Sequence, residues 1–503
     1  MSSLHVAGLR SVAGLTFRLD RVRILAWALS MAGLTYAVAN AWSSLYPTVQ
    51  SREQFATALQ SSPALTGLLG PLYNPISTGG LTAWRIGSGL VMVLGLVSAF
   101  IVVRHTRTDE AAGRTDLIRS AGVGRATPGL VAIGAAALID LLFAFGAVIV
   151  LIALGEQVAG AFAFALGVAG GALVFAAVAL LCAQLLGTSR AANGLASLIA
   201  ALAFMAYAVG NSTPELDWLA MATPFGWANR SRPFAGENWW LVALPFVIAA
   251  ALVIAGLLLG TRRDLGASIV APRGGRPHAP RWLRSPSGLT WRLDRSQLAT
   301  WVLAMLVLGI FVGYLAKTAS DLLRSNPQLS GFLDRLGGDA GVSDSYVLVM
   351  LGVLSFGSAA YAVTSLLRTH LDETAGRLEL LLAAPKSRLG LLTFRTLLVA
   401  GGVVVIQAAA GIGVGISNGL ANHDVGSLVP RYLAVALIAV PAVWIIAGVA
   451  VAVVGGLPRW SWLAWVALGY CIAVGELGPI LGLPEWTERT TPFWFSPKWP
   501  VDD

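Results

Sequence analysis

The sequence predicts an all-α polytopic membrane protein, on the evidence of its composition, its long apolar stretches and an internal repeat. Of its 503 residues, 56% are hydrophobic and only 12% are charged, and the mean hydropathy is +0.74. Soluble domains contain roughly 25% charged residues. The composition therefore excludes a soluble enzyme. The net charge of +9 does not indicate a nucleic-acid partner, because the basic residues follow the membrane topology described below.

Eleven apolar stretches are predicted to cross the membrane, since a transmembrane helix needs about 20 mostly apolar residues. One of them contains Asp140 at mid-depth, and the last one is short. The predicted spans are residues 24–42, 86–103, 129–154, 158–186, 194–210 and 239–260 in the first half, and residues 298–316, 346–367, 397–417, 432–455 and 462–474 in the second half.

The basic residues predict the orientation. Most of the 34 lysines and arginines lie in the segments that share a side with the N-terminus, whereas acidic residues are more frequent in the other loops. By the positive-inside rule the N-terminus is cytoplasmic. Residues 1–23 lack a small-residue cleavage site after a short apolar core, which argues against a removed signal peptide. An amphipathic helix on the inner leaflet is the interpretation we favour, and an irregular basic tail is the alternative.

Four sequence blocks occur twice in the same order, which indicates an internal duplication. LTFRLDR at 15–21 returns as LTWRLDR at 289–295, and SPALTG at 62–67 returns as SNPQLSG at 325–331. DEAAGR at 109–114 returns as DETAGR at 372–377, and the tripeptide TPF occurs at 223–225 and 491–493. Because six spans precede the second copy, the two halves are predicted to be parallel repeats of six-helix type.

The repeat divides the chain into four parts. These are a cytoplasmic amphipathic segment (1–23), a first transmembrane half (24–260), a basic cytoplasmic linker (261–296) and a second transmembrane half (297–503). A second half with six spans, like the first, would include a twelfth span, but no apolar stretch follows the second TPF block. Either the chain has eleven spans and an external C-terminus, or it is a truncated form of a twelve-span protein.

The sequence offers no catalytic residue and no metal site. A nucleotide-binding P-loop needs Gly-Lys-Ser/Thr, but Lys317, Lys386 and Lys498 are the only lysines, and alanine or proline precedes each of them. The five histidines have no metal-ligand spacing, and both cysteines lie in apolar runs. If the protein transports against a gradient, its energy must come from a partner or from an ion.

Two related segments follow the second and eighth spans and are the strongest candidates for a functional site. In each, we expect the aspartate to cap a short helix and the glutamate to pair with the arginine four residues later. A short amphipathic cytoplasmic helix suits docking to another protein, and the alternative is a solvated loop that only sets topology. The residues are Asp109, Glu110, Gly113, Arg114 and Asp116 in the first copy and Asp372, Glu373, Gly376, Arg377, Glu379, Leu381 and Pro385 in the second.

The second segment, ETAGRLELLLAAPKSR at 373–388, resembles the first intracellular loop of ABC-2 type (type V exporter) ABC transporter permeases. Those loops read approximately E-x-x-x-G-R-x-E-L-L-x-x-x-P-x-x-R. Two fused halves that both carry the loop resemble the "exporter of polyketide antibiotics" and tetronasin-type multidrug exporter permeases. The first copy departs from the pattern, since Gly122 replaces the proline and Asp116 replaces the glutamate.

The resemblance implies a transport subunit that has no cofactor of its own. Two copies of a separate ABC ATPase subunit would hold ATP and Mg and would receive the two segments as coupling helices. The chain would export bulky amphiphilic compounds, such as polyketide-like antibiotics, across a bacterial plasma membrane. Its implied path runs by the second, fifth, eighth and eleventh spans, with the candidate contacts Phe204, Tyr207, Tyr361, Tyr470 and Asp140.

Two other functions remain open at this point. A major-facilitator drug transporter driven by protons also has two parallel six-span halves, but its signature loop has Asp-Arg where this chain has Asp109-Glu110 and Asp372-Glu373. A membrane scaffold is the third class. Asp140 could serve in a proton relay, or it could be a neutral carboxyl or one hydrogen-bonded between helices. Because the second copy keeps the proline and the leucines, we expect Glu373→Ala to impair coupling more than Glu110→Ala.

Overall fold

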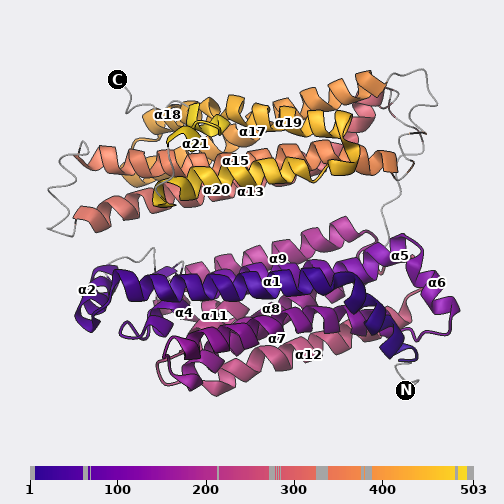
Figure 1. Ribbon diagram of the computed structural model, residues 1–503, viewed down its shortest axis with the longest axis horizontal. Coiled ribbons are helices and arrows are strands. Elements are labelled where there is room, and N and C mark those ends of the chain that lie inside the picture. The colour runs from indigo at the N-terminus through magenta and orange to yellow at the C-terminus, as the bar shows by residue number, and fades with distance from the viewer. Residues whose placement is uncertain are drawn as a thin grey trace. The chain divides into compact units, whose positions relative to one another are not determined.

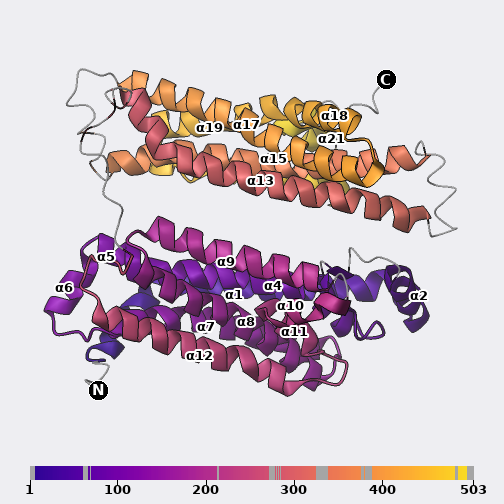
Figure 2. The ribbon, with the colours of Figure 1, turned by 180° about the vertical axis from the view of Figure 1, so that it is seen from behind.

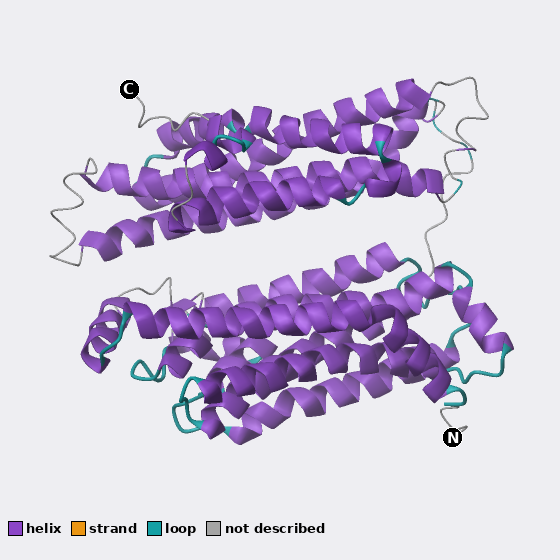
Figure 3. Cartoon of the chain, viewed as in Figure 1, coloured by secondary structure: helices purple, strands orange, loops and turns teal. Residues whose placement is uncertain are grey.

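The computed structural model is helical, and no strand occurs among the residues that it describes (Figure 3). These are residues 6–60, 66–67, 69–211, 214–270, 278, 280, 283, 285–324, 338–374, 376, 379, 388–481 and 485–495. Ten of the described helices are long and apolar enough to cross a membrane, and Leu463–Gly475 is a shorter apolar helix. The predicted all-α polytopic fold is therefore confirmed. The chain forms two compact units, Met1–Gly274 and Gly275–Asp503.

The first unit is a bundle of six long helices (Figure 1). They are α1 (Leu9–Leu45), α4 (Thr78–Val103), α7 (Thr127–Ala153), α8 (Val158–Leu185), α9 (Ser189–Gly210) and α12 (Trp239–Arg262). Shorter pieces connect them: α2 (Val49–Gln60), the π-helical turn η1 (Arg104–Thr108), α5 (Asp109–Ala111), α6 (Arg114–Ser120), η2 (Pro214–Leu216), α10 (Asp217–Met221) and α11 (Pro224–Arg230). Both views place α5, α6 and the N-terminus at one end of this bundle and α2 at the other (Figures 1 and 2).

Helix α8 is the centre of the first unit because it is apolar on every side. Such a helix has no polar face to expose, so it is surrounded by other helices. Its alanines and glycines allow close approach, and 78% of its span is buried, against 28% for α1. Helices α4, α7, α9 and α12 all pack on it. A Cβ on Gly170 would lie 2.8 Å from Pro245 of α12, which shows how tight the contact is.

The second unit contains α13 (Pro286–Arg324), α15 (Gly338–Thr374), α17 (Arg388–Asn422), α18 (Val425–Ile438), α19 (Val440–Gly456) and α20 (Leu463–Leu481). The short helices η5 (Pro458–Trp460), α21 (Glu485–Glu488) and η6 (Pro492–Phe495) complete it. The predicted span 432–455 is divided into α18 and α19 near Ala439. Pro441 stands in the first turn of α19, where a missing backbone N–H is tolerated and the preceding helix ends.

Equivalent helices pack in equivalent pairs within the two units. Helix α1 packs on α7 as α13 packs on α17, and α4 packs on α8 as α15 packs on α19. The repeated TPF blocks also take similar positions. Thr223 caps α11 by accepting a hydrogen bond from the Gly226 N–H at 3.1 Å, and Phe225 is fully buried. In the second unit, Phe493 packs on Phe356 with ring centroids 4.7 Å apart.

The helices are longer than the predicted spans, and this changes two expected boundaries. Residues 9–23 are helical as expected, but they continue into the first span as part of one helix of 37 residues. At 1.5 Å per residue that helix is roughly 55 Å long, more than the roughly 30 Å hydrocarbon core requires. The expected linker 261–296 is too long at both ends, because α12 reaches Arg262 and α13 begins at Pro286.

Two glycines bring α13 and α17 into backbone contact, and this contact yields a stability prediction. A Cβ on Gly309 would lie 2.3 Å from the Ala410 carbonyl oxygen, and one on Gly313 would lie 2.5 Å from the Val414 carbonyl oxygen. A backbone carbonyl can move only with its helix. We therefore expect Gly309→Val to lower the thermal unfolding temperature in detergent, at a cost of roughly 1–3 kcal/mol from overpacking.

Gly401→Val is the matched control, because Gly401 lies on α17 with no neighbouring atom within 4 Å of an added Cβ. Unfolding temperatures that are equal for the two variants would show that the close contact between α13 and α17 does not contribute to stability.

Candidate functional site

Each candidate segment begins at the end of a long helix and turns at a glycine. In the first copy, α4 continues through η1 into α5, and Gly113 then adopts φ +70°. In the second copy α15 runs to Thr374, and Gly376 adopts φ +69°. The two turns match, since each glycine N–H donates to the carbonyl of the glutamate three residues earlier at 3.0 Å. A left-handed conformation of this kind favours glycine over any residue with a Cβ.

The expectation that the aspartates cap a helix is wrong. Asp109 and Asp372 do not precede a helix but lie in the last turns of helices that come from the membrane. In the first copy the next helix, α6, begins after Gly113, and its Leu117 is 74% exposed. In the second copy Glu379 is exposed. The predicted site residues Arg377, Leu381 and Pro385 lie outside the described residues.

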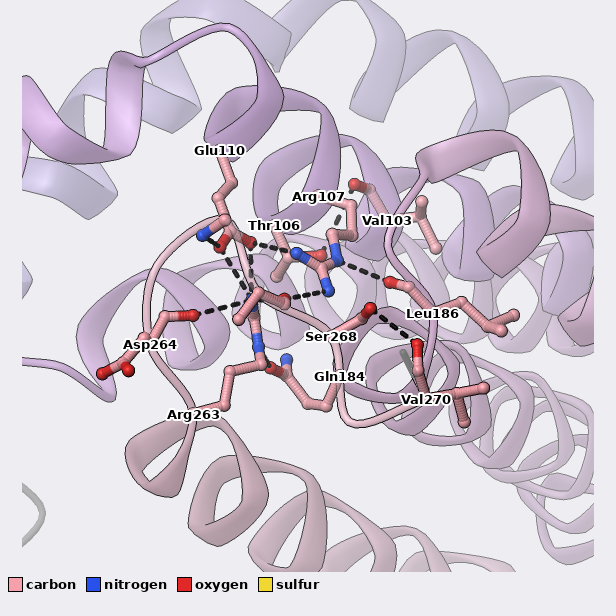
Figure 4. A network of polar contacts seen from close by, with 12 residues as sticks. Val103, Thr106, Arg107, Glu110, Gln184, Leu186, Arg263, Asp264, Ser268 and Val270 are labelled. Atoms are coloured by element: carbon pink, nitrogen blue, oxygen red, sulfur yellow. Dashed lines mark hydrogen bonds and ion pairs between the residues drawn. The ribbon is translucent and has the colours of Figure 1, made fainter. Parts of the chain in front are cut away.

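Glu110 is buried in a cluster of two arginines rather than presented to a partner (Figure 4). Its carboxylate receives two bonds from the Arg263 guanidinium, at 2.8 and 2.7 Å, and one from Arg107 at 3.0 Å. The Gly266 N–H also donates to it, at 2.6 Å. The exposed fractions of the Glu110, Arg107 and Arg263 side chains are 7%, 2% and 11%. The cluster therefore holds the end of the second span to the segment that follows α12.

Arg107 and Arg263 also fix the backbone around this carboxylate. Arg107 donates to the carbonyl oxygens of Leu186 and Ala267, both at 2.7 Å, and Arg263 Nε donates to Gln184 Oε1 at 2.9 Å. Residues 263–270 are thereby attached to the end of α8. The expected pairing of Glu110 with Arg114 is wrong, because Arg114 instead binds Asp109 at 2.8 Å and Glu110 already has stronger bidentate partners.

A second set of charges joins the first candidate segment to helix α1. Asp20, whose side chain is 1% exposed, accepts a hydrogen bond from Arg104 at 2.9 Å and another from His105 Nε2. The other nitrogen of the same imidazole, Nδ1, lies 3.5 Å from Asp109. His105 thus bridges a buried aspartate of α1 and the aspartate of the segment.

The second unit has the same bridge, made by a different residue. Asp294, the counterpart of Asp20 in the repeated LTxRLDR block, is buried and accepts from Arg368 at 2.7 Å. Arg395 of α17 lies 3.5 Å from Asp294 and 3.3 Å from Asp372. In both units, one basic side chain therefore connects the buried aspartate before the first span of that unit with the aspartate of the candidate segment.

Asp20 and Asp294 belong to one of the repeated blocks, but they were not predicted to be part of the site. The available signal was the block itself, since an acidic residue kept in both copies beside the start of an apolar helix needs a partner. The role of Arg263 had no sequence signal, because it lies 153 residues from Glu110.

The aromatic residues expected along the substrate path are mostly core residues of their own unit. Tyr207 is fully buried, donates to the Leu69 carbonyl at 2.8 Å and packs with Phe204 and Phe225. Tyr361 is 1% exposed, whereas Tyr470 is 47% exposed. Asp140 is 2% exposed, and it accepts a hydrogen bond from Ser98 of α4 at 2.9 Å.

Comparison with known proteins establishes the relationship of the chain. A family model described as "Multidrug efflux system permease Rv1217c, C-terminal domain" matches residues 9–259 and 283–503. The multidrug efflux system permease protein Rv1217c of Mycobacterium tuberculosis (strain ATCC 25618 / H37Rv) is 33% identical over 491 residues, which cover 96% of this chain and 88% of the relative. The chain belongs to this family of multidrug efflux permeases. The two matched stretches of the permease omit residues 260–282, most of which follow α12.

The buried position of Glu110 predicts how variants at the two glutamates of this permease differ in stability. Removing one partner of a buried ion pair leaves the other charge uncompensated, at a cost of roughly 3–5 kcal/mol. Glu110→Ala would leave the charges of both Arg107 and Arg263 without their carboxylate partner. We expect it to lower the thermal unfolding temperature strongly. Glu373→Ala is the matched control at an exposed position, and equal shifts for the two variants would contradict the role of the cluster.

The two bridges predict which replacements His105 accepts. Arg368 stands four residues before Asp372 as His105 stands four before Asp109, and it binds the buried Asp294 as His105 binds Asp20. We expect His105→Arg to keep stability and drug resistance near the wild-type level. His105→Leu should lose a charged hydrogen bond worth roughly 1.5–3 kcal/mol. Thermal unfolding and resistance of a deletion host measure the effect, and tolerance of leucine but not of arginine would refute the bridge.

Proposed function

We propose that this permease is the membrane subunit of an ATP-driven exporter of bulky amphiphilic compounds, including antibiotics of polyketide type. It would lie in a bacterial plasma membrane with its N-terminus, α5 and α6 on the cytoplasmic side. Two copies of a separate ABC ATPase subunit would bind ATP and Mg and would dock one to each candidate segment. The relative named a multidrug efflux permease supports the export of drugs.

The matching glycine turns are the observation that carries the proposal. Two turns of equal geometry, at Gly113 and Gly376, each follow a long helix and are each connected by a charge bridge to the start of the unit. Two equivalent contact points suit two copies of one partner. We attribute the equivalence to an internal duplication, which the shared helix pairs and the four repeated sequence blocks support.

Two features support an ATPase partner: the sequence has no Walker A motif, and the first candidate segment has an exposed apolar surface. No lysine of the chain follows a glycine, so a Walker A motif cannot form. Exposed α6, with Leu117 facing outward, can bury apolar area against a partner. A change in the partner would then reach the membrane helices through the rigid charge clusters around Glu110 and Asp109, which join α5 to α1, α8 and the segment after α12.

A proton-driven transporter is the second candidate, and Asp140 is the observation that favours it. A carboxyl buried within a span is costly and often functional, and Asp140 Oδ2 has no hydrogen-bond partner among the described residues. The two mechanisms differ in their energy source. Export that continues in the presence of a protonophore and stops on ATP depletion supports the ATPase partner, and the opposite result supports the proton.

The docking of the first segment can be tested with two exposed apolar residues. Leu117 lies on α6, and Val49 (49% exposed) lies on α2 at the opposite end of the first unit (Figure 1). Burial of a leucine contributes roughly 1.5–3 kcal/mol. We therefore expect Leu117→Asp to weaken ATPase binding about 10- to 100-fold, whereas Val49→Asp leaves it unchanged.

The measurement is co-purification from the native host in mild detergent, followed by native mass spectrometry and drug-stimulated ATP hydrolysis. The expected species holds one permease and two ATPase subunits. A permease that is purified alone and still exports drug after reconstitution without ATP would overturn the proposal.

A further inference from the structure

A cavity of about 60 Å³ opens beside the Glu110 cluster in the first unit. Its floor is apolar and comes from Leu180 of α8 and from Gly129, Gly256 and Leu257 of α7 and α12. Its rim is polar and belongs to the α6–α7 connection and to the end of α12. The cavity is far smaller than the roughly 300–1,000 Å³ of a site for a drug-sized ligand. The cavity can therefore enclose only a small group of a larger molecule, such as one phosphate, and not a whole drug molecule.

The rim is basic. Arg119, Arg125 and Arg263 line it, together with the acidic residues Glu110 and Asp264. The charge of Glu110 is already balanced, because Arg263 and Arg107 both bind it. Arg125 is exposed and uses one nitrogen to bind the Thr261 carbonyl at 3.1 Å, which leaves its other nitrogens for a ligand. The remaining charges give the rim an excess of positive charge.

Arg119 is the most informative residue of this rim. Its side chain is half-buried at the cavity, and its guanidinium makes no hydrogen bond or ion pair with any residue that the structure describes. The start of α7 also faces the cavity through Ala126 and Pro128, and a helix N-terminus carries a partial positive charge. An arginine that has no partner among the described residues, beside such a helix end, is suited to an anion with several acceptor oxygens.

We propose that this cavity binds the phosphate headgroup of an anionic phospholipid, with the first carbons of an acyl chain against the glycine-rich wall. The shared ligand chemistry is a phosphate, and the apolar floor distinguishes a lipid from a free phosphate ion. Basic pockets between membrane helices on the cytoplasmic side suit such headgroups. The assignment to the inner leaflet rests on the proposed orientation of the permease, whereas the presence of the site does not.

The bound lipid would stabilise the attachment of α6 to the membrane helices, and the proposed function requires that this attachment is rigid. Arg119 lies on α6, Arg125 precedes α7, and Arg263 belongs to the Glu110 cluster. One phosphate that contacts Arg119 and Arg125 would connect the candidate docking helix to the start of α7 and, through the hydrogen bond from Arg125 to Thr261, to the end of α12. The lipid composition of the membrane would in this way influence how firmly α6 is held.

The test uses the purified full-length permease in detergent, with phosphatidylglycerol as the probe and phosphatidylcholine and inorganic phosphate as comparisons. Each arginine contributes about 1 kcal/mol to attraction of an anionic lipid, or about fivefold in affinity. We expect phosphatidylglycerol to raise the unfolding temperature, and Arg119→Gln combined with Arg125→Gln to weaken its binding about 25-fold by native mass spectrometry.

Arg262→Gln is the matched control, because Arg262 is an exposed arginine at the end of α12 that does not line the cavity. It should bind phosphatidylglycerol as the wild type does. Arg119→Lys combined with Arg125→Lys keeps the charge and should recover most of the affinity, which separates lost binding from misfolding. Equal binding by the glutamine variant and the control, or equal stabilisation by inorganic phosphate, would overturn the lipid site. Neither result bears on the ATPase partner, which is tested by co-purification.

Discussion

The structure depends most on how buried carboxylates are neutralised where the helices leave the apolar bundle. Asp20, Glu110 and Asp294 are all nearly inaccessible, and a buried charge is tolerated only when it is paired and hydrogen-bonded. Each therefore has two or more basic partners, at least one of which comes from a distant part of the same unit. These contacts fix the relative positions of helices whose apolar surfaces could otherwise slide past one another, since packing of alanine and glycine faces is not directional.

The two units make the same connection between two aspartates, but with different basic residues. The first uses a histidine from the turn after α4, and the second uses an arginine from α17, yet both connect the LTxRLDR aspartate with the aspartate of the candidate segment. The first unit adds the Glu110 cluster, which holds the segment after α12. Its α5 is consequently anchored on two sides, whereas in the second unit Glu373 is exposed. The two candidate segments thus share a glycine turn and a charge bridge and differ in the burial of the glutamate.

The sequence was sufficient to predict the fold class and the position of nearly every span, because hydrophobic length is a local property that the bilayer imposes. It was less successful at helix ends. Charged residues such as Arg23 and Arg295 were placed outside the membrane spans, but α1 and α13 include them as extra turns that continue directly into those spans. Gly113 and Gly376, two of the predicted site residues, both adopt a positive φ. The helix break that they impose was missed, since a positive φ cannot be distinguished from ordinary helical glycine by spacing alone.

No local sequence pattern could predict which charged residues pair with one another at the site. Glu110 was assigned to Arg114 because residues four apart meet on an isolated helix, and that rule fails once a π turn and a glycine interrupt the helix. The actual partner, Arg263, comes from the end of the last helix of the unit, and it reaches Glu110 because α8 holds both α4 and α12 against itself. The apolar packing of α8 therefore determines which charges meet. A change in the α8–α12 contact, far from any charged group, would reach the candidate docking segment through the same cluster.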